Sequence, residues 1–191
     1  MKTIRLVTAA LYLLPATAAA HPGHGGSGFL DGLLHPLLGA DHLAAVIAVG
    51  LLAAHLPPRT QPLPVAVFLG SSLAGALAAL GGSVAPGGET MIAASVLLLG
   101  VLLALLASTP RALAVALAGV LPLCGWFHGQ AHVAAATVAS SGYIGGFLAG
   151  TALLHLLGYR AGTAAGRHGM RWPLWAGASV GAFGVFLLAG L

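Results

Sequence analysis

The chain has 191 residues, of which 59% are hydrophobic and only 5% are charged, and its mean hydropathy is +1.00. Because a soluble domain usually carries about 25% charged residues, this composition excludes a soluble globular protein and indicates an integral membrane protein. The formal net charge of +4 is small and dispersed, so it indicates no nucleic-acid partner, and the single cysteine, Cys124, excludes an internal disulfide.

Residues 1–20 have the composition of a cleaved signal peptide. Two basic residues precede the apolar residues 6–14, and Ala18 and Ala20 occupy the small-residue positions of a cleavage site. The apolar run is too short to cross a bilayer as an uncleaved anchor. We therefore predict cleavage after Ala20, which leaves His21 as the mature N-terminus.

The mature chain, residues 21–191, reads as a single transmembrane domain. A spanning helix needs roughly 20 apolar residues. Segments of this kind lie at about 30–54, 63–85, 90–108, 112–136, 142–159 and 172–190. Small residues recur inside them, which favours close packing of helices in a membrane. The predicted fold is therefore an all-α integral membrane protein, a six-transmembrane-helix bundle after a cleaved signal peptide.

The arginines predict how this bundle is oriented. All arginines of the mature chain fall in the connectors 55–62, 108–111 and 159–171. These connectors share one side of the membrane, and the positive-inside rule places that side in the cytoplasm. We predict a multi-pass protein of the bacterial inner (plasma) membrane with both mature termini in the periplasm.

The sequence HPLLGADH, at residues 35–42, places ionisable side chains inside the first predicted span. An ionised Asp at a helix centre costs about 2.5–3.5 kcal/mol on insertion scales, so Asp41 is expected to face the interior and to serve a function. A straight helix would separate His35 from His42 by about 10 Å, too far to bind one ion. Because Pro36 disfavours helix at the preceding residue, we predict a bent first segment that folds His35 back toward Asp41 and His42.

The fourth predicted span carries the sequence CGWFHGQAH. His128 and His132 lie four residues apart on one helix face, a spacing that suits two ligands of one divalent ion. The alternative is a pair of core histidines bonded to carbonyls of neighbouring helices. Cys124 is expected to pack as a small hydrophobic residue. Both histidines fall at the same predicted depth as residues 35–42, so a single site is expected.

Three further residues could extend this site. Glu89 begins the third span on the periplasmic side of the membrane, where His35, His42, His128 and His132 are also predicted. His155 is the lone histidine of the fifth span, and it is either structural or a relay on the inward path. His21, with its free amine, and His24 form either a metal-collecting tail or a disordered stub. Imidazole with carboxylate suits Ni²⁺, Co²⁺, Zn²⁺ or Cu²⁺ better than Mg²⁺ or Ca²⁺.

These motifs resemble those of the HupE/UreJ family, hydrogenase and urease accessory proteins regarded as nickel or cobalt permeases. The first-helix signature is HPLLGADHLAAVIAVGLLA, and the blocks ETMIAASVLLLG, WFHGQAH and GYIGGFLAGTALLHLLG follow in family order. The resemblance covers the chain from His21. It implies a metal site formed by His35, Asp41, His42, His128 and His132, with Glu89 and His155 as further family positions.

One motif departs from the family pattern. Relatives commonly read FHGxAHGxE, whereas Val133 and Ala135 here replace the second glycine and the acid. The loss of that carboxylate removes a negative charge near the site, which affects the affinity or the choice of metal.

The sequence thus predicts a secondary transporter, not an enzyme, that imports Ni²⁺ or Co²⁺, with Zn²⁺ and Cu²⁺ also suited to the ligands. No permanently bound cofactor is expected. The predicted partners are the metal ion and the lipid bilayer, with an indirect link to the maturation of a nickel metalloenzyme such as hydrogenase or urease; a homo-oligomer is left open. Two alternatives are a haem-binding membrane electron-transfer subunit and an intramembrane hydrolase that pairs Ser71 or Ser72 with His155.

Overall fold

The computed structural model describes residues 28–106, 116–136, 140–167 and 171–191, and the regular structure in these ranges is helical. The helices are α2 (Phe29–Leu34), α3 (Ala40–His55), α4 (Pro62–Leu80), α5 (Gly88–Leu106), α7 (Leu121–Ala135), α8 (Ser141–Gly166) and α9 (Trp172–Ala189). A 3₁₀ turn, η1 (His35–Leu37), precedes α3, and a π-helical turn, η2 (Ala116–Val120), precedes α7. The predicted signal peptide, His21 and His24 lie outside the described residues.

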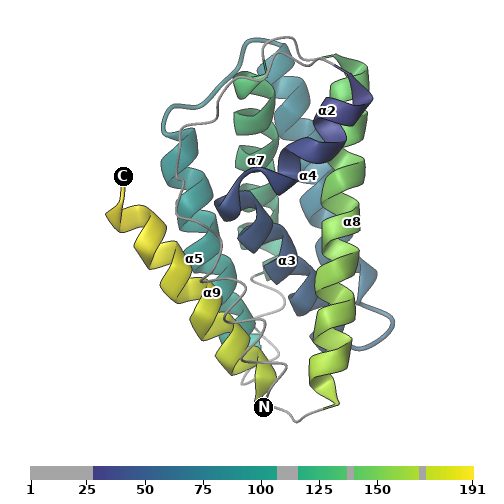
Figure 1. Ribbon diagram of the computed structural model, residues 1–191, viewed down its shortest axis with the longest axis vertical. Helices are drawn as coiled ribbons and strands as arrows, with labels where there is room; N and C mark the ends of the chain where they lie inside the picture. The colour runs from purple at the N-terminus through teal and green to yellow at the C-terminus, as the bar shows by residue number, and fades with distance from the viewer. Residues whose placement is uncertain (1–27, 107–115, 137–139, 168–170) are drawn as a thin grey trace.

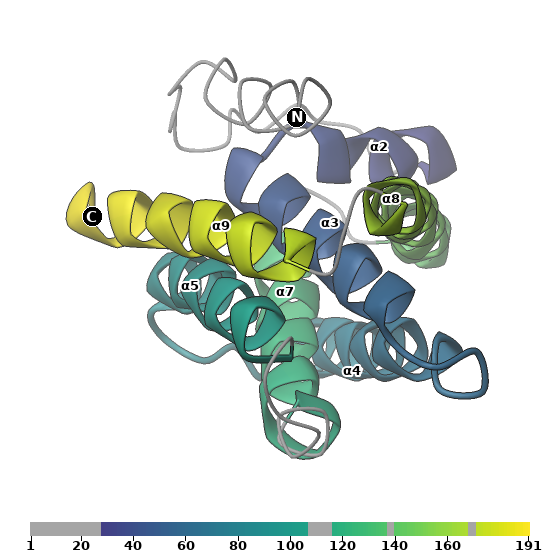
Figure 2. The same ribbon diagram turned by 90° about the horizontal axis from the view of Figure 1, so that it is seen from below.

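Helix α3 lies at the centre of the bundle. It contacts α8, α5, α4 and α9, and Figure 2 shows it enclosed by neighbouring helices. Side chains such as Ala45, Val49 and Leu52 have no exposed surface. The other main contacts pair α4 with α7, α5 with α9 and α2 with α8 (Figure 1). The helix that carries Asp41 and His42 in its first turn is therefore the central helix of the bundle.

Among the described residues, four helices, α4, α5, α8 and α9, are long and apolar enough to cross a membrane. The pair α2–η1 and α3 makes a fifth span if the bent pair is counted as one. Helix α7 has 15 residues, fewer than these spans, and the start of the predicted segment 112–136 lies outside the described residues. The described residues therefore support four spans, or five with the bent pair. The sixth predicted span stays a prediction.

Two predicted boundaries were wrong. The span predicted at 63–85 ends as α4 at Leu80, because the chain turns at Gly82, whose φ of +82° suits glycine. The span predicted at 142–159 continues as α8 to Gly166, so much of the predicted connector 159–171 is helical. Arg160 limits how far a helix can extend into lipid, but it does not end the helix, since arginine and alanine are good helix formers.

The predicted bend in the first span is confirmed. The segments Phe29–Leu37 and Ala40–His55 meet at an angle of 84°. Pro36 lies in the 3₁₀ turn, and Gly39 has an extended conformation (φ −105°, ψ 120°) immediately before α3. Since proline cannot donate a backbone hydrogen bond, the helix breaks here, and α2 runs across α8 before the chain turns into α3 (Figure 1).

The backbones of α4 and α7 are in close contact. This contact predicts that alanine substitution at two glycines of α4 has different effects on the stability of the protein. A Cβ atom at Gly75 would overlap the Trp126 carbonyl, whereas a Cβ atom at Gly70 would meet nothing within 4 Å. Gly75→Ala should lower the free energy of unfolding by about 1–3 kcal/mol, the usual effect of overpacking, and Gly70→Ala should not. Thermal unfolding in detergent measures both, and equal melting temperatures would contradict this account of the α4–α7 contact.

Candidate metal-binding site in the bundle interior

Four histidines from three segments meet where the first span bends. His35 comes from η1, His42 from the first turn of α3, and both His128 and His132 from α7. His132 lies between His35 and His42. Its Nδ1 is 2.7 Å from His35 Nε2, and its Nε2 is 2.7 Å from His42 Nδ1. Three imidazoles thus form one hydrogen-bonded chain across the bundle, and His42 and His132 are buried.

His128 joins this group through its ring. The ring centroid lies 5.0 Å from that of His42 and 6.2 Å from that of His132. Its Nδ1–H donates to the Cys124 carbonyl at 2.8 Å, which leaves Nε2 with its lone pair and no partner among the described residues. An imidazole fixed in this tautomer is the form that ligates metals.

Helix α8 supplies the remaining wall of the histidine cluster. The Tyr143 hydroxyl donates to the His132 carbonyl at 3.3 Å, and the Phe147 ring lies 5.1 Å from the His132 ring. Thr151 Oγ1 lies 3.5 Å from His42 Nε2. These residues were missed by the sequence analysis, although their spacing of four residues, continued by His155 and Tyr159, marks one face of a helix.

The two carboxylates predicted for this site have different positions. Asp41 is half-buried in the first turn of α3, and its Oδ1 accepts the backbone N–H of His42 at 2.7 Å. A carboxylate at this end of a helix is stabilised by the helix dipole. Glu89 is exposed in the first turn of α5, and among the described contacts none joins it to the four imidazoles. Asp41 is thus joined to His42 of the cluster, whereas Glu89 is exposed and has no described contact with the four histidines.

His155 lies deeper in the bundle and makes its own contacts. Its Nδ1–H donates to the Val46 carbonyl at 2.8 Å, and its ring meets the Phe68 ring edge-on with centroids 5.2 Å apart. Its Nε2 is buried and has no partner among the described residues. His155 is therefore fixed in the same tautomer as His128.

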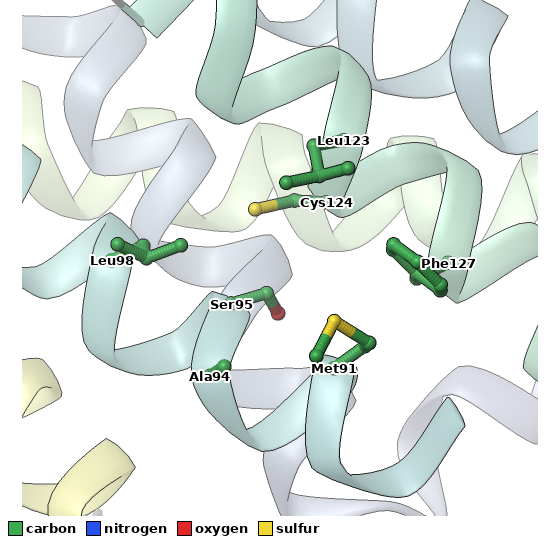
Figure 3. Close-up of a pocket in the computed structure, with 7 residues that line it drawn as sticks. All are labelled: Met91, Ala94, Ser95, Leu98, Leu123, Cys124 and Phe127. Atoms are coloured by element: carbon green, nitrogen blue, oxygen red, sulfur yellow. The ribbon is translucent and has the colours of Figure 1, made fainter. Parts of the chain in front are cut away.

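Cys124 behaves as predicted, as a buried residue that packs against its neighbours. Its side chain lines a small pocket of about 30 Å³ between α5 and α7, which Figure 3 shows with the sulfur of Met91 and the hydroxyl of Ser95 facing it. None of the four clustered histidines lines this pocket. The pocket is therefore separate from the candidate site.

The described side chains do not hold a ready-made metal site. Within the described ranges, no group of three or more His, Cys, Asp or Glu residues is arranged to hold a metal ion as it stands. The nitrogens of His35, His42 and His132 instead bond to one another. Binding an ion here requires that the ion replace these hydrogen bonds.

Neither alternative reading is supported by the structure. The Ser71 hydroxyl donates to carbonyls of its own helix, and Ser72 Oγ and His155 Nε2 both lack a partner, so no described serine bonds to His155 as a hydrolase would require. The rings of His42 and His132 are 4.4 Å apart between centroids, which leaves no room for a porphyrin between them.

Comparison with known proteins covers nearly the whole chain. A family model described as "HupE / UreJ protein" matches residues 9–187. Protein HupE of Rhizobium leguminosarum bv. viciae is 36% identical over 186 residues, which is 96% of this chain and 96% of that protein. No solved structure matches the chain. Both matches include the bend of the first span and the α7 motif that together form the histidine cluster.

Proposed function

Because the chain belongs to the HupE/UreJ family, we propose that it is a permease that imports Ni²⁺ or Co²⁺ across the bacterial inner membrane. The observation that carries this proposal is the meeting of His35, His42, His128 and His132 at a broken helix in the bundle interior. Broken helices with ionisable groups at their ends are typical ion sites of transporters.

The chemistry of the cluster favours borderline first-row ions. Neutral imidazoles bind such ions at about 2.0–2.1 Å, taking zinc as a guide, and they bind Mg²⁺ or Ca²⁺ poorly. Each N–H···N bond occupies the lone pair of one imidazole nitrogen, so an arriving ion must break these bonds to reach the lone pairs, while each neutral ring keeps its proton on its other nitrogen. Asp41, next to His42, supplies the negative charge that offsets a divalent cation.

The membrane potential is a sufficient driving force for this transport. A divalent ion that moves inward gains about 4.6 kcal/mol per 100 mV, twice the value for one charge. In the proposed orientation, Arg59, Arg160, Arg167 and Arg171 face the cytoplasm and both mature termini face the periplasm. The imported ion supplies a nickel metalloenzyme such as hydrogenase or urease, and the chain itself has no catalytic role.

Uptake into proteoliposomes tests the proposal directly. The purified protein is reconstituted with a metal-sensitive dye inside the vesicles, and Ni²⁺, Co²⁺, Zn²⁺ and Cu²⁺ are added side by side. We expect Ni²⁺ or Co²⁺ to enter fastest, and a negative potential inside the vesicles to accelerate entry. Vesicles without protein are the control. Entry of none of the four ions above that control would refute the proposal.

A further inference from the structure

Three buried polar atoms around Phe68 have no hydrogen-bond partner among the described residues. They are Ser72 Oγ on α4, His128 Nε2 on α7 and His155 Nε2 on α8. The Phe68 ring lies 5.3 Å from the His128 ring and 5.2 Å from the His155 ring, measured between centroids. Ser72 follows Phe68 by one helical turn, on the same face of α4. Buried polar groups are nearly always paired, so three unpaired ones from three helices require an explanation.

The positions of Thr151 and His155 along helix α8 show how deep the unpaired atoms lie relative to the outer cluster, which consists of His35, His42 and His132 with His128 beside them. Thr151 of that helix contacts His42, a member of the outer cluster. His155 comes one turn later, about 6 Å along the helix, toward the end that carries Arg160 and Arg167. The unpaired atoms therefore lie further along the proposed inward direction than the chain of three hydrogen-bonded imidazoles.

We propose that Ser72, His128 and His155 form an inner binding position for the transported divalent transition-metal ion. This inference rests on the proposed function and deepens it, because it gives the ion a second position beyond the outer cluster. His128 contacts both the His42 ring and the Phe68 ring, so it belongs to both positions. A ligand that is common to two positions lets the ion move inward without losing all its coordination at once.

The ligand types explain why the inner position can release the ion. The outer cluster has Asp41 beside it, whereas two neutral imidazoles and a hydroxyl provide no negative charge to the inner position. The inner position therefore binds a divalent cation more weakly. Transport requires binding that is strong enough for entry and weak enough for release, and a strong outer site followed by a weak inner one meets both conditions.

The two neighbouring serines of α4 provide a matched test by uptake. Ser72→Ala removes a hydroxyl that has no partner, so it should leave the melting temperature unchanged or raise it, yet it should slow Ni²⁺ uptake about tenfold. Ser71→Ala, whose hydroxyl donates to carbonyls of its own helix and lies 3.5 Å from the Leu121 carbonyl of α7, should transport as the unmodified protein does. Wild-type uptake in Ser72→Ala would overturn the inner position.

A spectroscopic test detects the ion itself. In a Cys124→Ala background, Ser72→Cys replaces the proposed hydroxyl ligand with a thiol, and Ser71→Cys is the control. With Co²⁺ added to the purified full-length protein, the Ser72→Cys variant should show a thiolate-to-cobalt charge-transfer band, and the Ser71→Cys variant should not. Absence of the band in the Ser72→Cys variant, or equal bands in both, would contradict the inference.

Failure of the inner position can be distinguished from failure of the proposed function. His42→Ala, in the outer cluster, is expected to lose both equilibrium binding of Ni²⁺ and uptake. Ser72→Ala is expected to keep the binding and to show only the roughly tenfold slower uptake. If His42→Ala loses uptake and Ser72→Ala is not slowed, then only the inner position is refuted, and if the unmodified protein moves no ion, then the proposed function is refuted.

Discussion

Uptake of Ni²⁺ or Co²⁺ is expected to fall to background in Asp41→Asn, while the fold is retained. Asparagine keeps the side-chain oxygen that accepts the His42 N–H, so the start of α3 and the position of the imidazole should not change. What the substitution removes is the charge. Two unit charges 4 Å apart interact by about 4 kcal/mol at an effective dielectric of 20, which corresponds to about a thousandfold in binding.

Asp31→Asn is the matched control for this prediction. Asp31 is an exposed carboxylate at the start of α2, and like Asp41 it accepts a backbone N–H, that of Gly28, at 3.1 Å. No described hydrogen bond or ring contact joins it to the four clustered histidines, so Asp31→Asn should transport like the unmodified protein. Initial rates of radiolabelled uptake at matched expression measure both variants. Normal uptake by Asp41→Asn would refute a carboxylate-assisted imidazole site.

His132→Ala is expected to abolish both metal binding and transport. His132 bonds to half-buried His35 and to buried His42 at once, so its removal takes a hydrogen-bond partner from both imidazoles. Each such loss costs about 1–3 kcal/mol, so the apo protein should also be less stable. The residues Phe147 and Tyr143 of α8 remain, which preserves the wall of the cluster.

The stability loss must be separated from the loss of the site. A ligand present at 100 times its dissociation constant stabilises a protein by about 2.7 kcal/mol, so Ni²⁺ or Co²⁺ should raise the melting temperature of the unmodified protein. His132→Ala should lose this increase. The control His55→Ala, which removes a half-buried ring 5.9 Å from the Trp172 ring at the other end of α3, should keep it. An undiminished increase in His132→Ala would exclude His132 as a ligand.

Local sequence was sufficient to predict the bend that forms the site. Pro36 and Gly39 break the first helix through covalent and steric restrictions that act within a few residues, and no neighbouring helix is needed to explain them. The spacing of His128 and His132 likewise placed both on one side of α7. The extension of α8 beyond Tyr159 was missed, because the prediction followed hydropathy, which marks the edge of lipid and not the end of a helix.

The sequence by itself determined the membrane class, the approximate helices, the bend at Pro36 and the identity of the imidazoles available for a site. Only the tertiary structure decided which of them meet: His132 bonds to both His35 and His42, His155 packs on Phe68, and Glu89 stays exposed. The physical reason is that an apolar helix in lipid has no polar face to mark its outer side. Lipid and protein interior are equally apolar, so packing of small residues and interhelical hydrogen bonds set the rotation of each helix, and these depend on the partner helix.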